Sequence, residues 1–324
     1  MPDRYIQPLR AAVQLLFFTM TVRLGIDFFN FVRHFRSAGA SPYVARPEGI
    51  EAFLPVSGLV GMTAWIRGLG INPVHPAAMV LFLTIIAISF LLRRSFCSFI
   101  CPIGTISEIG WKTGYRIFHR NIRIPRWPDI SLRSLKYLLL LFFLYTVSFS
   151  ISTDDLAQFI FSDYHKVADI HLLDFFINLS FFSGGILLLL FSLSIFIKNP
   201  FCRYLCPYGA LLGVAAIFSP LRITRNRQRC VSCGVCDAVC PSHIDVMNKS
   251  VVISPECLGC FRCVSHCRAK GALSMNFTAD FAIPGILFVL LMLLLFWGGK
   301  ELGIMTGHWK SCIDYQEYSR LLGG

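Results

Sequence analysis

Long apolar stretches separated by shorter polar segments run along most of this chain. Five of them are about 17–25 residues long and carry almost no charge, which is the length that an α-helix needs to cross about 30 Å of hydrocarbon. They cover residues 11–31, 76–92, 135–151, 174–197 and 281–297. The pattern predicts an all-α polytopic membrane protein with five transmembrane helices.

A further apolar stretch, residues 53–69, is interrupted by Pro55, Gly58, Gly61 and Arg67. It is a candidate sixth span. We interpret it instead as an interfacial or re-entrant helix on the outer face, because a sixth crossing would disturb the distribution of charge along the chain.

Charged residues are distributed asymmetrically between the polar segments. The segment between the second and third spans is basic, whereas the one between the third and fourth is acidic. The basic residues are Arg93, Arg94, Lys112, Arg116, Arg120, Arg123, Arg126 and Arg133, and the acidic ones are Asp154, Asp155, Asp163, Asp169 and Asp174. We expect the chain to lie in the inner membrane of a bacterial cell. The positive-inside rule then places the N-terminus, residues 93–134 and residues 198–280 on the cytoplasmic side. Residues 32–75, residues 152–173 and the C-terminal tail are expected outside.

The net charge of +12 fits the same explanation. Nucleic-acid binding requires a basic surface on a folded soluble domain, whereas here the cations cluster beside the ends of apolar segments. The first span contains Arg23 and Asp27, and more charges follow it before any small-residue cleavage site. We therefore interpret it as a retained helix and not as a signal peptide.

Eight of the thirteen cysteines form two runs with the spacing Cys-x-x-Cys-x-x-Cys-x-x-x-Cys. This is the pattern of bacterial ferredoxins with two [4Fe–4S] clusters, in which the fourth cysteine of each run ligates the other cluster. The expected ligand sets are Cys230, Cys233, Cys236 and Cys267 for one cluster, and Cys257, Cys260, Cys263 and Cys240 for the other. Zinc sites take four ligands in two separated pairs, and disulfide scaffolds are short secreted proteins, so neither alternative predicts two consecutive runs of this kind.

The cysteine runs define the predicted domains. Residues 1–219 form a transmembrane helical region, residues 220–279 an inserted α+β ferredoxin module, and residues 280–324 the last helix and an extracytoplasmic tail. Arg262, Arg268 and Lys270 lie beside the second run. These cations could raise the cluster potentials or form a docking face for an acidic partner. It is equally possible that they only form a solvated face.

Four other cysteines occur in an internal repeat, Cys-x-x-x-Cys-Pro, which ends one membrane helix and begins a second helix in each copy. They are Cys97 and Cys101 in the first copy and Cys202 and Cys206 in the second. On a helix, a spacing of four places both thiols on one face. Because the motif occurs twice, we expect a redox or metal site here, such as an additional metal or cluster or a dithiol relay, and not buried structural cysteines alone.

Three further groups of residues are weaker candidates. Arg23 and Asp27 are one turn apart in the first span, and either serve a function or form a simple ion pair. His75, His165, Asp169 and His171 could line an outer-face site for quinol or a metal, although each histidine alone fits an interfacial hydrogen-bonding role. Cys312 has no partner cysteine in sequence and is assigned no role.

These motifs resemble the membrane-bound polyferredoxins of the NosR/NapH type. The resemblance rests on residues 46–55, residues 75–77, both Cys-x-x-x-Cys-Pro-x-x-Gly segments and both ferredoxin runs. It implies electron transfer between quinol in the membrane and an extracytoplasmic reductase or its maturation. NosR-type proteins carry a flavin domain before the helices, whereas this chain starts ten residues before the first span. An outer-face flavin or haem is therefore expected on a separate protein.

The leading hypothesis is a membrane-anchored electron-transfer subunit that links quinol or a cytoplasmic donor to an extracytoplasmic redox partner. It is expected to work within an oxidoreductase system and not as a stand-alone enzyme, because neither ferredoxin run lacks a ligand that would open an iron to substrate. A copper-reducing assembly factor for a respiratory metalloenzyme and a redox sensor are the alternatives, since four thiolates can hold copper(I).

Overall fold

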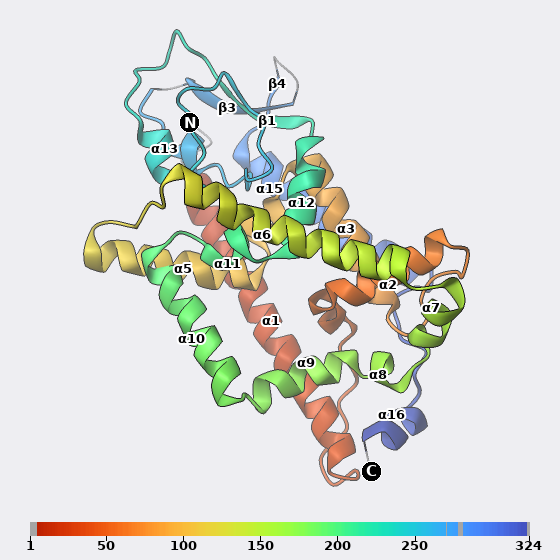
Figure 1. Ribbon diagram of the computed structural model, residues 1–324. Helices are drawn as coiled ribbons and strands as arrows, with labels where there is room; N and C mark the ends of the chain where they lie inside the picture. The colour runs from red at the N-terminus through yellow and green to blue at the C-terminus, as the bar shows by residue number, and fades with distance from the viewer. Residues whose placement is uncertain (1–4, 270, 278–280, 323–324) are drawn as a thin grey trace. The chain divides into compact units, whose positions relative to one another are not determined.

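The computed structural model describes residues 5–269, 271–277 and 281–322. Its chain is mostly helical and includes one small sheet (Figure 1). The residues form two compact units. The first contains the chain up to Phe18, Ile85–Leu140 and Ile186–Phe296, and the second contains Thr19–Thr84, Leu141–Gly185 and the chain from Trp297 on. All the cysteines except Cys312 lie in the first unit.

The helices vary greatly in length. Those of twelve or more residues are α1 (Ile6–Arg36), α2 (Pro55–Ile66), α3 (Pro76–Leu92), α5 (Pro102–Phe118), α6 (Arg126–Tyr145), α10 (Phe181–Phe196) and α15 (Gly285–Met305). The shorter ones are η2 (Glu48–Phe53), α4 (Ser95–Phe99), η3 (Thr146–Ser150), α7 (Thr153–Ile160), α8 (Asp163–Lys166), α9 (Ala168–Ile177), α11 (Pro200–Tyr204), α12 (Pro207–Ile217), α13 (Val235–Val239), α14 (Arg262–Ser265) and α16 (Tyr315–Leu322).

Three helical stretches among the described residues are long and apolar enough to cross a membrane: α1, the continuous stretch Trp127–Ser150, and α15. A bent pair, α9 and α10, gives a fourth if it counts as one span. Only 11% of the apolar window in Trp127–Ser150 is buried within the protein, so most of its apolar side chains are free to contact lipid.

The segment predicted as a span over residues 174–197 is not one continuous helix. The helix breaks after Ile177, and α9 and α10 meet at 83°. Asn178 ends α9, with its N–H donating to the carbonyl of Asp174, and the Ser180 hydroxyl accepts from the N–H of Ser183 in the first turn of α10. Polar side chains that satisfy helix ends favour such a break, which an average of hydropathy over the window does not detect.

The segment predicted as interfacial or re-entrant forms α2, which at about 18 Å is too short to cross a bilayer. Gly58 lies against α3, where an added Cβ would come within 2.9 Å of the Ala78 carbonyl oxygen. The small residues that interrupt the apolar pattern thus allow close packing of α2 on α3. The position of α2 relative to a membrane stays a prediction.

The last predicted span, residues 281–297, is displaced toward the C-terminus. Phe281–Ala282 form a strand, and α15 runs over Gly285–Met305. The helix continues through Gly299 and Gly303 because these glycines pack tightly against Thr84 and Val80 of α3; a Cβ at Gly299 would lie 2.3 Å from the Thr84 hydroxyl oxygen. Close packing of small residues thus offsets their low helix propensity.

Three strands of the predicted ferredoxin module and one strand just beyond it form an antiparallel sheet in the order β2-β1-β3-β4 (Figure 1). The strands are Val251–Val252, Leu221–Arg225, Leu273–Phe277 and Phe281–Ala282. Ile223 of β1 pairs with Met275 of β3, and both side chains are buried. The loops between β1 and β3 carry α13, α14 and both cysteine runs. The sheet therefore provides the framework on which the cysteines are placed.

Candidate iron–sulfur site

Cysteines from both runs line a shared pocket. Its cysteines are Cys230, Cys233, Cys236 and Cys267, which we call the first set. Gly234 has a left-handed backbone conformation (φ 69°) that begins α13 and brings Cys236 into the pocket. Cys233 is exposed. Backbone N–H donation at Ser232 and the guanidinium of Arg225, whose Nη1 lies 3.6 Å from the Cys230 Sγ, lower the pKa of Cys230.

The remaining ferredoxin cysteines line a second pocket. They are Cys240, Cys257, Cys260 and Cys263, which we call the second set. Cys240 and Cys257 are only 8% and 9% exposed, within the main hydrophobic core. Burial raises the pKa of the Cys240 thiol to about 12. The two sets therefore differ in exposure: the first includes the exposed Cys233, whereas no cysteine of the second set is exposed.

Each pocket thus combines three cysteines of one run with the last cysteine of the other. Among the described residues, no group of three or more His, Cys, Asp or Glu side chains is arranged to hold a single metal ion. A [4Fe–4S] cluster needs no such convergence, because each of its four thiolates binds a different iron. The grouping of the cysteines is the one that two-cluster ferredoxins use.

Two buried arginines at the end of α3 hold the loop that carries the second set. Arg93 donates to the carbonyl oxygens of Val252 and Ser254 at 3.3 and 3.0 Å. Arg94 donates to the carbonyl oxygen of Pro255 at 3.1 Å. The two arginines are 0% and 1% exposed. The sequence suggested cations flanking a membrane helix, whereas the structure uses them as internal anchors.

A carboxylate adjoins this arginine anchor. Glu256, one residue before Cys257, accepts from Lys136 Nζ at 2.6 Å and from Arg94 Nη1 at 3.4 Å. Lys136 is fully buried. The buried lysine and arginine thus tie α6 and the end of α3 to the second-set loop through one carboxylate.

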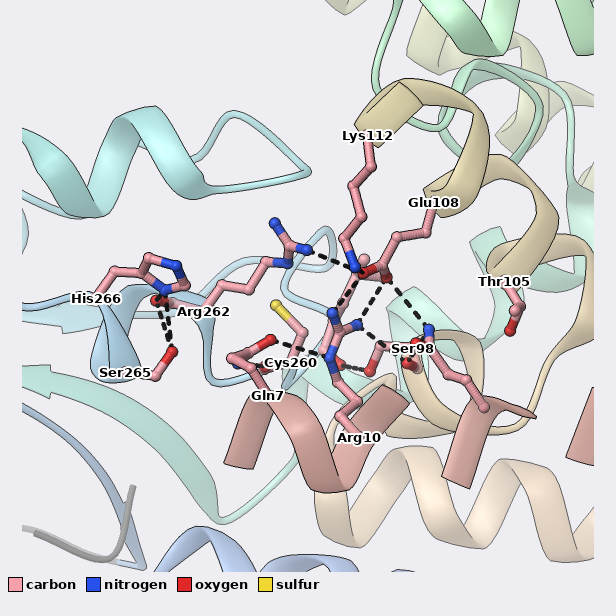
Figure 2. Close-up of polar contacts among 12 residues, drawn as sticks. Gln7, Arg10, Ser98, Thr105, Glu108, Lys112, Cys260, Arg262, Ser265 and His266 are labelled. Atoms are coloured by element: carbon pink, nitrogen blue, oxygen red, sulfur yellow. Dashed lines mark hydrogen bonds and ion pairs between the residues drawn. The ribbon is translucent and has the colours of Figure 1, made fainter. Parts of the chain in front are cut away.

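A second buried carboxylate, Glu108 of α5, lies among three cations near Cys260 of the second set (Figure 2). Its oxygens accept from Arg10 of α1 at 2.5 and 2.8 Å, from Arg262 at 2.9 Å and from Lys112 at 2.6 Å. Burial alone would raise the pKa of Glu108, but Arg10 and the other cations hold it well below its usual range.

The Glu108 network reaches the second set directly. Gln7 Nε2 donates to the backbone carbonyl of Cys260 at 3.0 Å (Figure 2). Burial raises the pKa of Cys260, and the charge of Arg10 partly offsets this rise. The Arg262 guanidinium lies 4.6 Å from the centre of the Trp111 ring. Three cations and one carboxylate leave an excess of positive charge next to the second set, which favours an added electron there.

The two copies of the Cys-x-x-x-Cys-Pro repeat have the same local structure. In each, a five-residue helix (α4 or α11) carries the first cysteine, and the second cysteine, with extended backbone, is the N-cap of the next helix. Cys101 and Cys206 therefore lie at the helix break and not on the same helix as their partners, which the spacing alone did not reveal. Proline follows at the first helical position, where its missing N–H is tolerated.

The glycine two residues after each motif proline allows the two helices to meet closely at the break. A Cβ at Gly104 would lie 2.3 Å from the Cys97 carbonyl oxygen, and one at Gly209 would lie 3.6 Å from the equivalent oxygen of Cys202. The Gly209 N–H donates to the Cys206 Sγ at 3.2 Å. The glycine lets the second helix start directly against the carbonyl end of the short one.

The two copies lie close enough for their thiols to interact. Burial, and then the neighbouring Cys101, Cys206 and Cys97, raise the pKa of Cys202 well above its usual range. Burial raises the pKa of Cys101 to about 12, so its thiol is neutral unless a ligand replaces the proton. The structure thus brings together the four cysteines that sequence analysis singled out, and we call them the cysteine quartet.

We expect Gly104→Ala to destabilise the protein by about 1–3 kcal/mol, because the new methyl group overlaps a backbone oxygen that cannot move freely. Thermal unfolding of the purified protein measures the effect. Gly298→Ala on α15 is the control, since no described atom lies within 4 Å of its added Cβ. An equal loss in both variants would contradict the tight contact at Gly104.

Comparisons with known proteins agree with this chemistry. A family model described as a 4Fe–4S binding domain matches residues 74–125 and 179–225, and a 4Fe–4S dicluster domain matches residues 222–268. The putative electron transport protein YccM of Escherichia coli K12 is 38% identical over 319 residues, which cover 97% of this chain and 89% of YccM. The chain belongs to the membrane-associated polyferredoxins of the NapH/NosR type.

More distant relatives include two that give this type its name. The ferredoxin-type protein NapH of E. coli K12 is 28% identical over 54% of this chain and 59% of NapH. The regulatory protein NosR of Stutzerimonas stutzeri is 27% identical over 46% of this chain and 20% of NosR. No solved structure matches significantly. The expected resemblance is confirmed, and this polyferredoxin is a transmembrane 4Fe–4S protein of the electron-transport class.

The second unit of the polyferredoxin contains a buried ionic network. Arg46 Nη2 donates to Asp169 at 2.7 Å and to Glu51 at 2.9 Å, and His75 Nδ1 lies 3.1 Å from the same Glu51 oxygen. His75 Nε2 lies 2.7 Å from the His165 carbonyl oxygen. The network therefore contains three of the four residues predicted to line an outer-face site, namely His75, His165 and Asp169.

The fourth predicted outer-face residue has a different environment. His171 is exposed and stacks on Tyr164 with ring centres 5.0 Å apart. Arg46 and Glu51, which complete the buried network, were missed as site candidates. Both lie in the stretch that carried the family resemblance, which was the signal available in the sequence.

The network predicts two opposite pH effects on stability. Burial alone would lower the pKa of His75, but the hydrogen bond and charge of Glu51 raise it above its usual range. Burial and the neighbouring His75 lower the pKa of His165 to about 4. His75 therefore stabilises the fold below about pH 6.5 and loses this effect as pH rises, whereas neutral His165 loses stability as pH falls below about 6.5.

Thermal unfolding of His75→Gln and His165→Gln between about pH 5 and pH 8 tests these signs. The stability difference between wild type and His75→Gln should grow toward acid pH, on the order of 1 kcal/mol. The difference between wild type and His165→Gln should grow toward alkaline pH. Parallel slopes for the two variants would show that the network does not separate the two histidines.

The remaining candidates are resolved more simply. Arg23 and Asp27 form an ion pair at 2.9 Å in which the arginine side chain is 76% exposed, as expected for an ordinary intrahelical pair. Cys312 is exposed. Arg262 belongs to the Glu108 network, Arg268 is exposed, and Lys270 lies outside the described residues.

Proposed function

We propose that this polyferredoxin is a membrane-anchored electron carrier that links quinol or a cytoplasmic donor to an extracytoplasmic redox partner. The observation that carries the proposal is the pair of pockets, each lined by four cysteines in the grouping that two-cluster ferredoxins use. A [4Fe–4S] cluster in each pocket would supply one-electron transfer without bond chemistry. The protein is thus proposed to be an electron-transfer subunit and not a stand-alone enzyme.

The residues of the two pockets have separable roles in this proposal. The first set would hold one cluster near the surface, and the second set would hold the other in the core. Arg225 at the first set and Arg10 with Arg262 at the second provide positive charge that favours the reduced state. Arg93, Arg94 and Glu256 keep the second-set loop in place.

We further propose that the cysteine quartet holds a third iron–sulfur cluster. The family model described as a 4Fe–4S binding domain covers both copies of the repeat and ends before the ferredoxin runs. The Ser98 hydroxyl, next to Cys97, donates to the Leu258 carbonyl beside Cys257 at 2.9 Å. The quartet therefore adjoins the second-set loop, where an electron leaving the second cluster would need its next acceptor.

The proposed topology is multi-pass, with the three domains of residues 1–219, 220–279 and 280–324. The ferredoxin module lies on the cytoplasmic side of a bacterial inner membrane. The support is the charge asymmetry: Arg116 and Arg120 are exposed in the basic segment, and the acidic segment carries Asp154 and Asp155 in the first turn of α7. The extracytoplasmic partner would be a reductase, or a flavin or haem protein that serves one.

Anaerobic purification followed by iron analysis and electron paramagnetic resonance tests the cofactors. We expect about eight iron atoms for two clusters and about twelve if the quartet holds a third. Quinol added to membranes should reduce the clusters if quinol is the donor. Fewer than about four iron atoms in fresh anaerobic protein would reject the proposed function.

The quartet is tested by changing Cys97, Cys101, Cys202 and Cys206 to serine, with Cys312→Ser as the matched control because that cysteine is exposed and belongs to neither set. Loss of about four iron atoms only in the quartet variant supports the third cluster. Loss of stoichiometric copper instead would reject it in favour of the copper-handling alternative.

A further inference from the structure

Exposed arginines surround the part of the first set that reaches the surface. Val231 is 65% exposed and Cys233 is exposed. Arg229 directly precedes Cys230, and Arg268 directly follows Cys267, so each adjoins a cysteine of the first set. Arg227, two residues before Arg229, is also exposed. We call Arg227, Arg229 and Arg268 the arginine rim.

The fold brings the two chain segments of the rim together. The Asn226 N–H donates to the Ala272 carbonyl at 2.9 Å, which places the segment before Cys230 beside the segment after Cys267. The guanidinium of Arg229 lies over Gly271, where an added Cβ would come within 2.7 Å of Nη1. Cations from both segments therefore flank the same opening.

The carboxylates Asp237 and Glu256 of the module have partners other than this rim. Asp237 Oδ1 accepts from the N–H groups of Val246 and Met247 at 2.7 and 3.0 Å. Glu256 is paired with Arg94 and Lys136. Among the described residues, no ion pair joins Arg227, Arg229 or Arg268 to a carboxylate, in contrast to Arg262, which is paired with Glu108. The rim is therefore an exposed cluster of cations beside an exposed cysteine.

We propose that the arginine rim is the docking surface for a small, acidic one-electron carrier protein of the flavodoxin or ferredoxin class, which delivers electrons to the first cluster. This inference rests on the proposed function and names the cytoplasmic donor. The carrier is oxidised by one electron as the first cluster is reduced by one, and no bond or proton is exchanged. Complementary charge orients the carrier and speeds its association.

The contrast between the two sets supports this location. Cys240 and Cys257 of the second set are buried, and the cations next to that set are engaged with Glu108. The first set has both of the features that transfer between proteins needs: an exposed thiol and free charge around it. A lipid surface carrying negative headgroups would meet the same charges but has no electron to supply.

The test uses the full-length protein with its clusters in detergent and a chemically reduced acidic flavodoxin as the probe. Stopped-flow absorbance follows reduction of the clusters at several salt concentrations. We expect the second-order rate constant to fall by about tenfold or more between about 20 and 200 mM salt. Arg227→Glu, Arg229→Glu and Arg268→Glu together should slow the low-salt reaction by about tenfold or more and reverse or remove its salt dependence.

Arg116→Glu with Arg120→Glu is the matched control, since both arginines are exposed and lie outside the ferredoxin module. This variant should keep the wild-type rate and salt dependence. Iron content and reduction by dithionite are measured for every variant. A change in cluster potential alone would alter the rate without altering its dependence on salt, so the salt series separates docking from driving force.

The result that would overturn the inference is wild-type kinetics in the triple rim variant. Equal slowing in the control pair, or a rim variant that loses binding only to phosphatidylglycerol vesicles, would overturn it as well and assign the rim to general or lipid electrostatics. In each of these cases dithionite still reduces the clusters, so the proposed function stands. Absence of clusters in the wild-type protein would instead reject the proposed function itself.

Discussion

Replacing Glu108 with alanine is expected to destabilise the protein by about 3–5 kcal/mol, because it leaves Arg10 and Arg262 buried without a counter-charge. The side chains of Arg10 and Arg262 are only 3% and 11% exposed. The same change adds net positive charge beside Cys260 and should raise the midpoint potential of the second cluster relative to the first. Thermal unfolding and potentiometric titration measure the two effects.

Lys112 provides a control within the same network. Its Nζ lies 2.6 Å from Glu108, but its side chain is 42% exposed, so water replaces the lost partner when it is changed. We expect Lys112→Gln to reduce stability by less than about 1 kcal/mol. If Glu108→Ala is no more harmful than Lys112→Gln, the buried network does not stabilise the junction of α1, α5 and the second-set loop.

The second large effect is expected at the second cysteine set. Cys260→Ser should remove about four iron atoms and lower the unfolding temperature strongly, because the cluster would otherwise fill a pocket lined by the core cysteines Cys240 and Cys257 and offset the charge of Arg10. Iron analysis and thermal unfolding of the same anaerobic preparation measure both changes.

Cys233→Ser is the matched comparison, since Cys233 occupies the equivalent place in the first run but is exposed. It should also remove about four iron atoms while lowering the unfolding temperature less. Equal falls in unfolding temperature for the two variants would show that the lower exposure of the second set contributes little to stability.

Features that depend on short, regular spacing could be predicted from the sequence. The cysteine runs specified which cysteines would share a pocket, because two or three residues between ligands leave few ways to surround a cluster. The proline of each Cys-Pro pair predicted a helix break. The sequence did not predict that the cysteine before the proline would itself lie outside both helices, as the N-cap. Hydropathy located the helices of the spans but not the bend after Ile177.

The roles of the charged residues could not be predicted. Arg93, Arg94 and Lys136 lie beside apolar helices in the sequence and match the expected flanks of membrane spans. In the structure their partners are Ser254, Pro255 and Glu256, more than a hundred residues away along the chain. A buried cation is stable only where such distant carbonyls and carboxylates meet it, and no local pattern contains that information.

The sequence by itself therefore determined the class of this protein: the membrane helices, the iron–sulfur chemistry and the grouping of the eight ferredoxin cysteines. Only the tertiary structure decided which cysteine of the two sets is exposed, since burial depends on what packs around each loop. It also decided that Glu108 and Glu256 hold the cations around the second set. Local spacing fixes which cysteines share a pocket, whereas desolvation and long-range packing fix the electrostatic environment of each set.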